Sequence, residues 1–306
     1  MVASLPRISV IIPSFNYADR IEAAIRSVIA QSETRWECII VDDGSQDNSC
    51  EIIQRVIQGD NRFMLITHAD GKNHGLAASL QLALSFCRAP LLAFLEADDS
   101  WAPSSLAERM HVMDTHPKAA LCCNIPEIVV EDGADGAFQM YVGQVLQYLA
   151  KRGGKPAKMP LLTILALNPL CTFSCVMVRR DLFTACSFDT PVAPILDKWL
   201  WQQMSLMGEC LVVNSTLTRW HIHKSSYIAR RKDSELARNT LFVQETRKLL
   251  LPDAKGKYGL GVFCLLTFYG PATFIVRIIT KFRVAGVKAG LRAVKQACQR
   301  FFLRQS

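Results

Sequence analysis

The apolar positions of the first hundred residues occur in short unbroken runs, separated by longer stretches of mixed character. We expect these runs to form β-strands, and they cover residues 8–12, 36–41, 63–67 and 90–95. Because the runs are continuously apolar and do not alternate, we expect strands buried on both faces, as in a parallel sheet. The stretches between them have helical patterns, near 19–31, 47–58 and 75–88. Such repeated strand–helix units predict a doubly wound α/β domain of the nucleotide-binding type.

Polar residues follow three of the four runs: PSFN at 13–16, DDGSQDNS at 42–49 and EADDSWAP at 96–103. In a doubly wound sheet, ligands bind beyond the carboxyl ends of the strands, so these three loops are expected to face one crevice. The third loop holds the acids Glu96, Asp98 and Asp99. Two explanations stay open for them. They are either a site for a divalent metal or a polar strand end in which Asp99 or Ser100 caps the next helix.

The pattern loosens in the second half of the chain. There we expect helices near 104–115 and 194–208 and strands over 119–125 and 174–180. The predicted organisation is therefore a catalytic domain over 1–250, followed by a helical tail over 251–306. Within the domain, 7–118 is expected to be the nucleotide-binding half and 119–250 the acceptor half.

Composition adds two expectations. Half of the 306 residues are hydrophobic, which allows a sizeable core, and the 11 cysteines are scattered without metal-type spacing. We therefore expect buried thiols in a reducing compartment. The first residues, MVASLPRISVII, lack the charged start and long apolar stretch of a signal peptide, which favours a cytoplasmic location.

The net charge of +8 belongs to the end of the chain. Residues 255–306 hold ten Lys and Arg and no acid. Residues 258–276 are uncharged, although Gly270-Pro271 interrupts them, and a basic amphipathic pattern follows. The tail could attach peripherally to an anionic membrane surface, span the bilayer, or pack on a protein. We favour the peripheral attachment.

Several segments, read in order, resemble the family 2 glycosyltransferases of GT-A fold. They are ISVIIPSFN (8–16), WECIIVDDGSQDNS (36–49), NHGLAASLQLAL (73–84), FLEADD (94–99), LDKWLWQQ (196–203) and WHIHKSS (220–226). The likeness runs over about residues 7–226 and leaves the tail uncovered. Glu96 and His221 depart from it, since the family usually has Asp and Arg at those positions. The resemblance implies a Rossmann-like, mostly parallel sheet flanked by helices, and transfer of a sugar from a nucleotide-diphosphate donor.

The resemblance also implies a metal site. Mn²⁺ or Mg²⁺ would neutralise the diphosphate leaving group as a Lewis acid, and one carboxylate with phosphate oxygens and waters is enough to hold it. We predict Asp99 as that ligand, with Asp98 at the metal-bound water or the ribose. His223 is a further candidate for the metal or the diphosphate, although a lone His is also often an ordinary hydrogen-bonded residue.

For the nucleotide, the resemblance implies that Asp43 contacts the base, which suits uridine or thymidine, with Asp42 as its neighbour. An Asp-Gly-Ser turn chosen for its geometry explains part of the same motif. Phe15 is a candidate for stacking on the base, and Pro13 for shaping that loop. Gly75 is expected where the backbone approaches the ligand at a helix start.

Asp197 is the candidate general base, because inversion needs a carboxylate within reach of the acceptor hydroxyl on the face opposite the leaving group. It could instead be an acid favoured by a helix N-terminus.

We therefore predict an inverting, metal-dependent glycosyltransferase that uses a UDP- or dTDP-sugar and acts on a glycan or lipid-linked acceptor. It would work on the inner face of the plasma membrane, held there by its tail. A nucleotidyltransferase is less consistent, because PSFNYADR lacks a glycine-rich phosphate loop. A nucleic-acid-binding protein is also less consistent, because few aromatic residues interleave with the charges of the tail.

Overall fold

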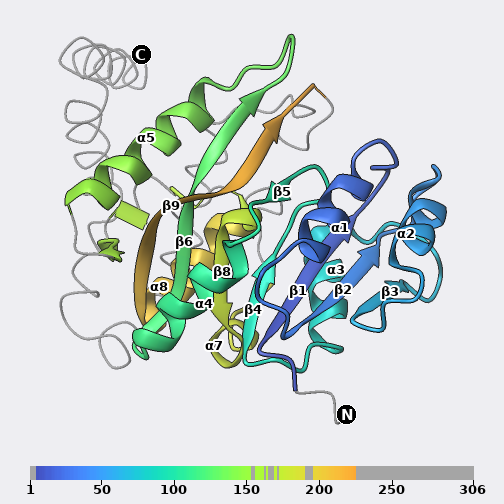
Figure 1. The fold of residues 1–306 in the computed structure, drawn as a ribbon, viewed down its shortest axis with the longest axis horizontal. Helices are drawn as coiled ribbons and strands as arrows, with labels where there is room; N and C mark the ends of the chain where they lie inside the picture. Colours follow the sequence, from blue (N-terminus) through green and yellow to red (C-terminus); the bar gives the residue numbers. More distant parts are fainter. Residues whose placement is uncertain are drawn as a thin grey trace, which may run out of the picture.

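A computed structural model of the chain describes residues 5–152, 156–161, 163–164, 169–170, 172–189 and 196–224. Within these ranges the strands form one sheet in the order β3-β2-β1-β4-β8-β6-β9-β5, and β7 pairs with β9 (Figure 1). The predicted tail, 251–306, lies outside the described residues, as does the end of the predicted acceptor half.

The first half of the sheet is parallel, as predicted. Its strands are β1 (Ile8–Ser14), β2 (Trp36–Asp42), β3 (Phe63–Thr67) and β4 (Leu91–Phe94). The connecting helices are α1 (Ile21–Ile29), α2 (Ser49–Ile57) and α3 (Gly75–Leu84). In the register of β1 and β2, Ser14 lies opposite Asp42, so the polar loops after these strands start side by side.

The second half of the sheet is mixed, because short antiparallel strands join the long parallel pairing of β6 and β9. Its strands are β5 (Ser100–Trp101), β6 (Ala119–Val130), β7 (Ala157–Lys158), β8 (Val176–Arg179) and β9 (Glu209–Ile222). β8 is antiparallel to both β4 and β6, whereas β9 is parallel to β6 and antiparallel to β5 and β7. An apolar run such as VMVR predicts a buried strand but carries no information about its direction.

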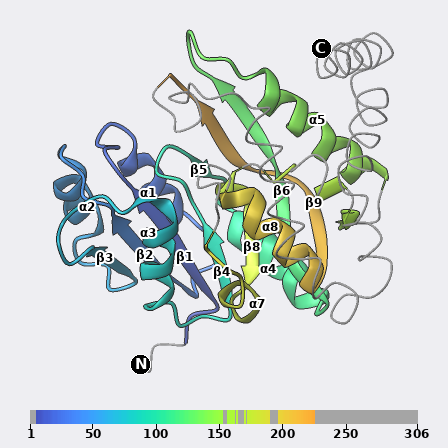
Figure 2. The same cartoon turned by 180° about the vertical axis from the view of Figure 1, so that it is seen from behind.

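Helices cover both faces of the sheet, as alternate side chains of the central strands require. Ile8, Val10 and Ile12 pack with α1, α2 and α4 (Ser105–Thr115) on one face. Ile11 packs on the other face with α3, α5 (Ala137–Arg152), α7 (Arg180–Thr184) and α8 (Leu196–Met207). Figure 2 shows α3 and α8 in front of the strands on this second face. Burial on both sides explains the continuous apolar runs.

The described cysteines follow the expectation of buried thiols. Eight cysteines lie in the described ranges, each as a thiol outside any disulfide, and all but Cys50 are buried. Burial raises the pKa of the Cys122 thiol to about 12, so it stays protonated and unreactive. As for membrane spans, the described helices include none with the length and apolar character needed to cross a bilayer.

Candidate active site

The polar loops after β1, β2 and β4 meet at one edge of the sheet. The amide of Asp43 donates to the carbonyl of Ser14 (2.8 Å), and the amide of Leu95 donates to the carbonyl of Ile11 (3.0 Å). A turn follows β4, closed by the amide of Asp99 donating to the carbonyl of Glu96 (3.0 Å). The three loops therefore begin side by side at one edge of the sheet.

The acids of the third loop form a cluster at this edge, in which Asp99 is buried and Glu96 and Asp98 are partly buried. Glu96 Oε2 accepts a hydrogen bond from Thr172 Oγ1 (2.5 Å), and the same hydroxyl lies 3.4 Å from Asp99 Oδ2. The Glu96 amide donates to Ser174 Oγ (2.9 Å). Thr172 precedes a short 3-10 helix, η1 (Phe173–Cys175), which leads into β8. The segment that leads into the antiparallel strand β8 therefore fixes the position of Glu96.

The end of β9 contacts Asp98 and Asp99. The amide of His221 donates to Asp99 Oδ1 (3.0 Å). His223 Nε2 lies 2.9 Å from Asp98 Oδ2, with 4% of the His223 side chain and 12% of the Asp98 side chain exposed. Tyr17 meets the His223 ring edge-on, with centroids 6.3 Å apart. The structure thus brings Asp98, Asp99 and His223 together, and His223 contacts the carboxylate of Asp98.

Burial and repulsion between neighbouring carboxylates determine the electrostatics of the acid cluster. Burial, and then the charges of Asp98 and Glu96, hold the pKa of Asp99 well above its usual range. Burial, followed by the charges of Asp98 and Asp197, raises the pKa of Glu96 to about 8. The carboxylate of Asp197, in the first turn of α8, therefore acts on the same cluster.

The cluster suits a partly solvated metal and not a closed protein cage. Among the residues that the structure describes, no three His, Cys, Asp or Glu side chains converge so as to hold an ion. A divalent cation at Asp99 would need phosphate oxygens and waters to complete its shell, as Mg²⁺ sites commonly do. Because burial and neighbouring charge raise the pKa values of Glu96 and Asp99, a bound cation would favour their ionised forms.

The Asp43 carboxylate lies at the edge where a base is expected, but its oxygens already accept hydrogen bonds. Asn73 Nδ2 (2.9 Å) and the Gly75 amide (2.9 Å) donate to Oδ2, and the His74 amide (2.8 Å) donates to Oδ1. His68 Nε2 is 3.3 Å from Oδ1. Because a carboxylate accepts at about four positions, a base N–H would replace one of these partners. In this structure Asp43 fastens the turn before α3.

The other predicted nucleotide residues lie around the same edge. Pro13 pairs with Val41 near the end of β1, and Phe15 follows in the loop, partly buried. Asp42 is 1% exposed, and its Oδ1 accepts from the Ser45 amide (2.9 Å), which closes the Asp-Gly-Ser turn. Asp42 thus has the turn-forming role that is the simpler interpretation of the motif.

Two glycines in these loops are required by the backbone. Gly75 has φ +82°, and no atom lies within 4 Å of where a Cβ would be. The positive φ therefore explains the glycine more directly than a close approach of the backbone to a ligand does. Gly44 has φ +78°, and a Cβ there would lie 2.7 Å from the backbone carbon of Lys72. The β2–α2 turn therefore packs directly against the loop before α3.

Sequence reasoning missed several residues of the site. Arg20 and Glu131 form an ion pair at its edge, and Thr172 and Ser174 hold Glu96. None stands in a motif with a chemical signature. Thr172 and Ser174 lie in a stretch whose pattern predicts only a strand and its approach. Their roles depend on β8 running antiparallel beside β4, which brings the segment before β8 to the end of β4.

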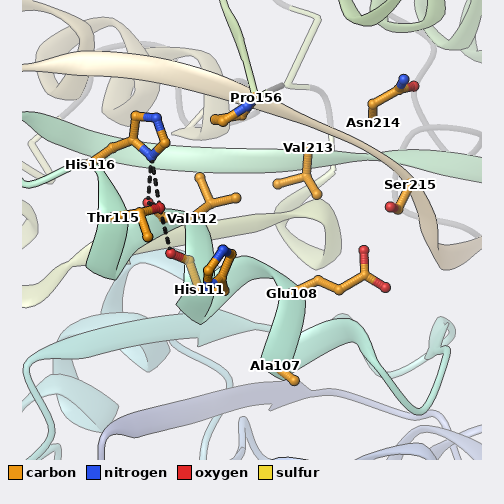
Figure 3. A pocket seen from close by; sticks show the side chains of 10 residues that line it. All are labelled: Ala107, Glu108, His111, Val112, Thr115, His116, Pro156, Val213, Asn214 and Ser215. Carbon is orange, nitrogen blue, oxygen red and sulfur yellow. Dashed lines mark hydrogen bonds between the residues drawn. The ribbon is translucent and has the colours of Figure 1, made fainter. Parts of the chain in front are cut away.

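Two cavities in the described part of the chain lie elsewhere. The larger, of about 550 Å³, is formed by α4, Pro156 and the bend of β9, and Figure 3 shows His111, His116 and Glu108 along its α4 side. The smaller, of about 320 Å³, lies between β5 and β9. Neither is lined by a predicted catalytic, nucleotide-binding or metal residue, although Ser100 to Pro103 of the third polar loop line the smaller one.

Comparison with known proteins agrees with this architecture. The family model "Glycosyl transferase family 2" matches residues 9–186, more than half of the chain. The glucosyltransferase WfgD of Escherichia coli is 26% identical over 233 residues, which are 76% of this chain and 83% of that protein. WfaP of the same organism is 32% identical over 108 residues, 35% of this chain and 41% of that protein. Both are named UDP-Glc:α-D-GlcNAc-diphosphoundecaprenol β-1,3-glucosyltransferases. The segments matched in several curated relatives span less than half of their length.

Solved structures share the fold. TarS of S. aureus (residues 1–349), in complex with UDP-GlcNAc, superposes with a TM-score of 0.65 at 15% identity, covering 91% of this chain and 81% of that one. The mannosyltransferase PcManGT of Pyrobaculum calidifontis, in complex with GDP-Man and Mn²⁺, gives 0.56 at 17% identity, covering 97% and 81%. Taken with the family match, this Rossmann-like mixed sheet places the chain among proteins of GT-A fold, and the chain belongs to glycosyl transferase family 2.

Proposed function

We propose that this chain is an inverting, metal-dependent glycosyltransferase that moves a sugar from a UDP- or dTDP-sugar to a hydroxyl of a glycan or lipid-linked acceptor. The observation that carries the proposal is the acid cluster. Asp98 and Asp99 are held side by side by the end of β9, and the charges of Asp98 and Asp197 both act on Glu96.

The chemistry of the donor set fits Mn²⁺ or Mg²⁺ bound with the donor diphosphate. Asp99 would hold the ion, Asp98 would contact it through water or bind the ribose, and His223 would orient Asp98 through their 2.9 Å contact. When bound, the cation supplies charge neutralisation for the leaving diphosphate. A neighbour of the same fold was solved with Mn²⁺ and a nucleotide sugar, which supports this assignment.

Asp197 would accept the proton of the acceptor hydroxyl as it attacks the sugar. It stands in the first turn of α8, a rigid helix whose Trp199 and Trp201 are buried in the core. A base on a rigid element keeps a defined distance from the bound donor. Its carboxylate must be ionised to act, and the neighbouring acids would need a cation to reduce their repulsion.

The acceptor and the location rest on relatives and on the tail. The two E. coli relatives carry names with a UDP-Glc donor and a diphosphoundecaprenol-linked acceptor, which supports a lipid-linked acceptor here. A peripheral tail over 251–306 would hold the domain at the membrane surface where such an acceptor lies. Cell-surface polysaccharide synthesis is the process that this combination suits.

A donor screen tests the proposal. Release of nucleoside diphosphate would be measured for a panel of nucleotide sugars, with acceptor lipid extract, in Mn²⁺ and in EDTA. We expect turnover of a uridine or thymidine donor that EDTA abolishes. Asp99→Asn should lower turnover at least a hundredfold, since about 3 kcal/mol of transition-state stabilisation would be lost.

Asp181→Asn is the matched control, because Asp181 is an exposed acid at the start of α7. It should leave turnover unchanged. If no donor in the panel is turned over, the enzyme assignment fails. If turnover continues unchanged in EDTA, the metal assignment alone is wrong.

A further inference from the structure

An ion pair joins the two halves of the chain at the edge of the site. Arg20, which directly precedes α1, donates from Nη1 to Glu131 Oε1 (2.6 Å) and from Nη2 to Glu131 Oε2 (2.9 Å). Glu131 directly follows β6. The two residues are 111 positions apart in sequence. Two parallel bonds between a guanidinium and a carboxylate fix the relative orientation of the groups as well as their distance.

Glu131 in turn is fastened to the end of β9. Its amide donates to the carbonyl of Ile222 (2.9 Å), and its Oε1 lies 3.5 Å from His221 Nδ1. The residues on either side of Ile222 contact the two acids. The His221 amide donates to Asp99, and the His223 ring lies within hydrogen-bond distance of Asp98. A continuous path of contacts thus runs from Arg20 through Glu131 and the end of β9 to both candidate metal acids.

The pair differs from the more exposed ion pair of Arg7 and Asp114. Arg7 and Asp114 make one 2.6 Å contact with 38% and 44% of their side chains exposed, whereas Arg20 and Glu131 are 23% and 34% exposed and bond twice. Exposed single pairs contribute little to stability. Arg20 holds the pKa of Glu131 down at about 2, chiefly through the hydrogen bonds. The hydrogen bond to Glu131 is the main cause that raises the pKa of Arg20, and the charge of Asp98 adds a smaller contribution, so the guanidinium also interacts with the site.

We propose that Arg20 is a positioning residue for the metal and diphosphate site, and that it acts through Glu131 to fix the end of β9 against Asp98 and Asp99. Arg20 need not touch the donor to do this. The inference rests on the proposed function for its catalytic consequence, but the positioning itself is a property of the protein without ligand.

Four variants of the full chain test it: Arg20→Gln, Glu131→Gln, the double variant and Arg20→Lys. Arg7→Gln is the control, because it removes the same charge from an ion pair at the opposite end of β1. The first readout is the Mn²⁺ concentration for half-maximal donor turnover, measured separately from kcat at saturating Mn²⁺. The second is hydrogen–deuterium exchange of the peptide over 219–223, measured in EDTA without donor.

We expect Arg20→Gln and Glu131→Gln each to raise the half-activating Mn²⁺ concentration about tenfold, equivalent to about 1.4 kcal/mol, with a smaller change in saturated kcat. The double variant should be no worse than either single one, since the pair acts as a unit. Arg20→Lys should recover part of the loss. Exchange over 219–223 should become faster in Arg20→Gln and stay unchanged in Arg7→Gln.

The two proposals fail in different ways. Equal Mn²⁺ activation in the wild type and Arg20→Gln, or additive losses in the double variant, would overturn the positioning role while turnover stands. If the wild type turns over no donor, the proposed function fails. Hydrogen–deuterium exchange over 219–223 in EDTA then still tests whether Arg20 fixes the end of β9. In that case faster exchange in Arg20→Gln supports the link from Arg20 to β9, and unchanged exchange refutes it.

Discussion

Glu96 offers a direct way to test the electrostatics of the acid cluster. Burial and the charges of Asp98 and Asp197 raise its pKa from an ordinary 4.5 to about 8. The folded protein therefore keeps a proton on Glu96 that the unfolded chain releases above about pH 4.5. The stability associated with that proton is fully present below this pH and is lost as pH rises through about 8. We predict that the metal-free protein becomes less stable between pH 6 and pH 8.

The magnitude follows from the proton count. One proton released on unfolding changes the free energy of unfolding by about 1.4 kcal/mol per pH unit. Two units give at most about 2.7 kcal/mol, and partial relaxation around Glu96 should leave about 1 to 2 kcal/mol. In Glu96→Gln, the new amide oxygen could still accept the Thr172 hydrogen bond, so this variant should flatten the pH dependence and keep the fold. Part of the slope should remain, because the pKa of Asp99 is also raised.

The assay is urea unfolding in EDTA at pH 6, 7 and 8 for wild type, Glu96→Gln and Glu51→Gln. Glu51 is an exposed acid in α2 and serves as the control. We expect the loss of stability in the wild type and in Glu51→Gln, and at least half of it removed in Glu96→Gln. The same slope in all three proteins would refute the reasoning, because Glu96 would then titrate as an ordinary exposed acid.

Three further predictions concern other parts of the chain. Asp197→Asn should keep donor binding, measured by calorimetry with UDP and Mn²⁺, but lower transfer by at least a hundredfold; normal transfer would remove the base assignment. Gly44→Ala should cost about 2 to 4 kcal/mol in urea unfolding, because its Cβ meets the Lys72 backbone, whereas Gly59→Ala, at φ +82° in open space, should cost about 1 kcal/mol. Replacing three basic residues of the tail, Lys288, Arg292 and Lys295, with Gln should weaken binding to anionic vesicles about a hundredfold in a flotation assay, at about 1 kcal/mol per residue. Unchanged flotation would argue against electrostatic attachment.

The nucleotide-binding half could be predicted closely from sequence, because both of its signals are local. Continuous apolar runs predict β1 to β4 within a residue or two, and the polar loops after them do meet at one edge. The placement of Asp98 and Asp99 at the end of a buried strand follows from the same pattern. Parallel strands that are covered on both faces make the runs distinctive.

The second half carries weaker signals. β9 has a short apolar run over 210–213 followed by mixed positions, and β6 continues past the predicted 119–125 through register shifts around Ile125. Helix α5 was not predicted from the sequence. The partners of the acids could not be predicted, because contacts such as Arg20 with Glu131 depend on which strands become neighbours.

The position of β9 also bears on how the protein can fold. Asp99 is held by an amide 122 residues later in the chain, and the family match ends at residue 186, before β9 begins. During synthesis, the acids at 96–99 would emerge long before the strand that pairs with them. Such distant contacts slow folding, since a long loop must close first. A fragment that ends at the family boundary would leave Asp98 and Asp99 without their partners from the β9 segment, and we expect it to be unstable or aggregation-prone.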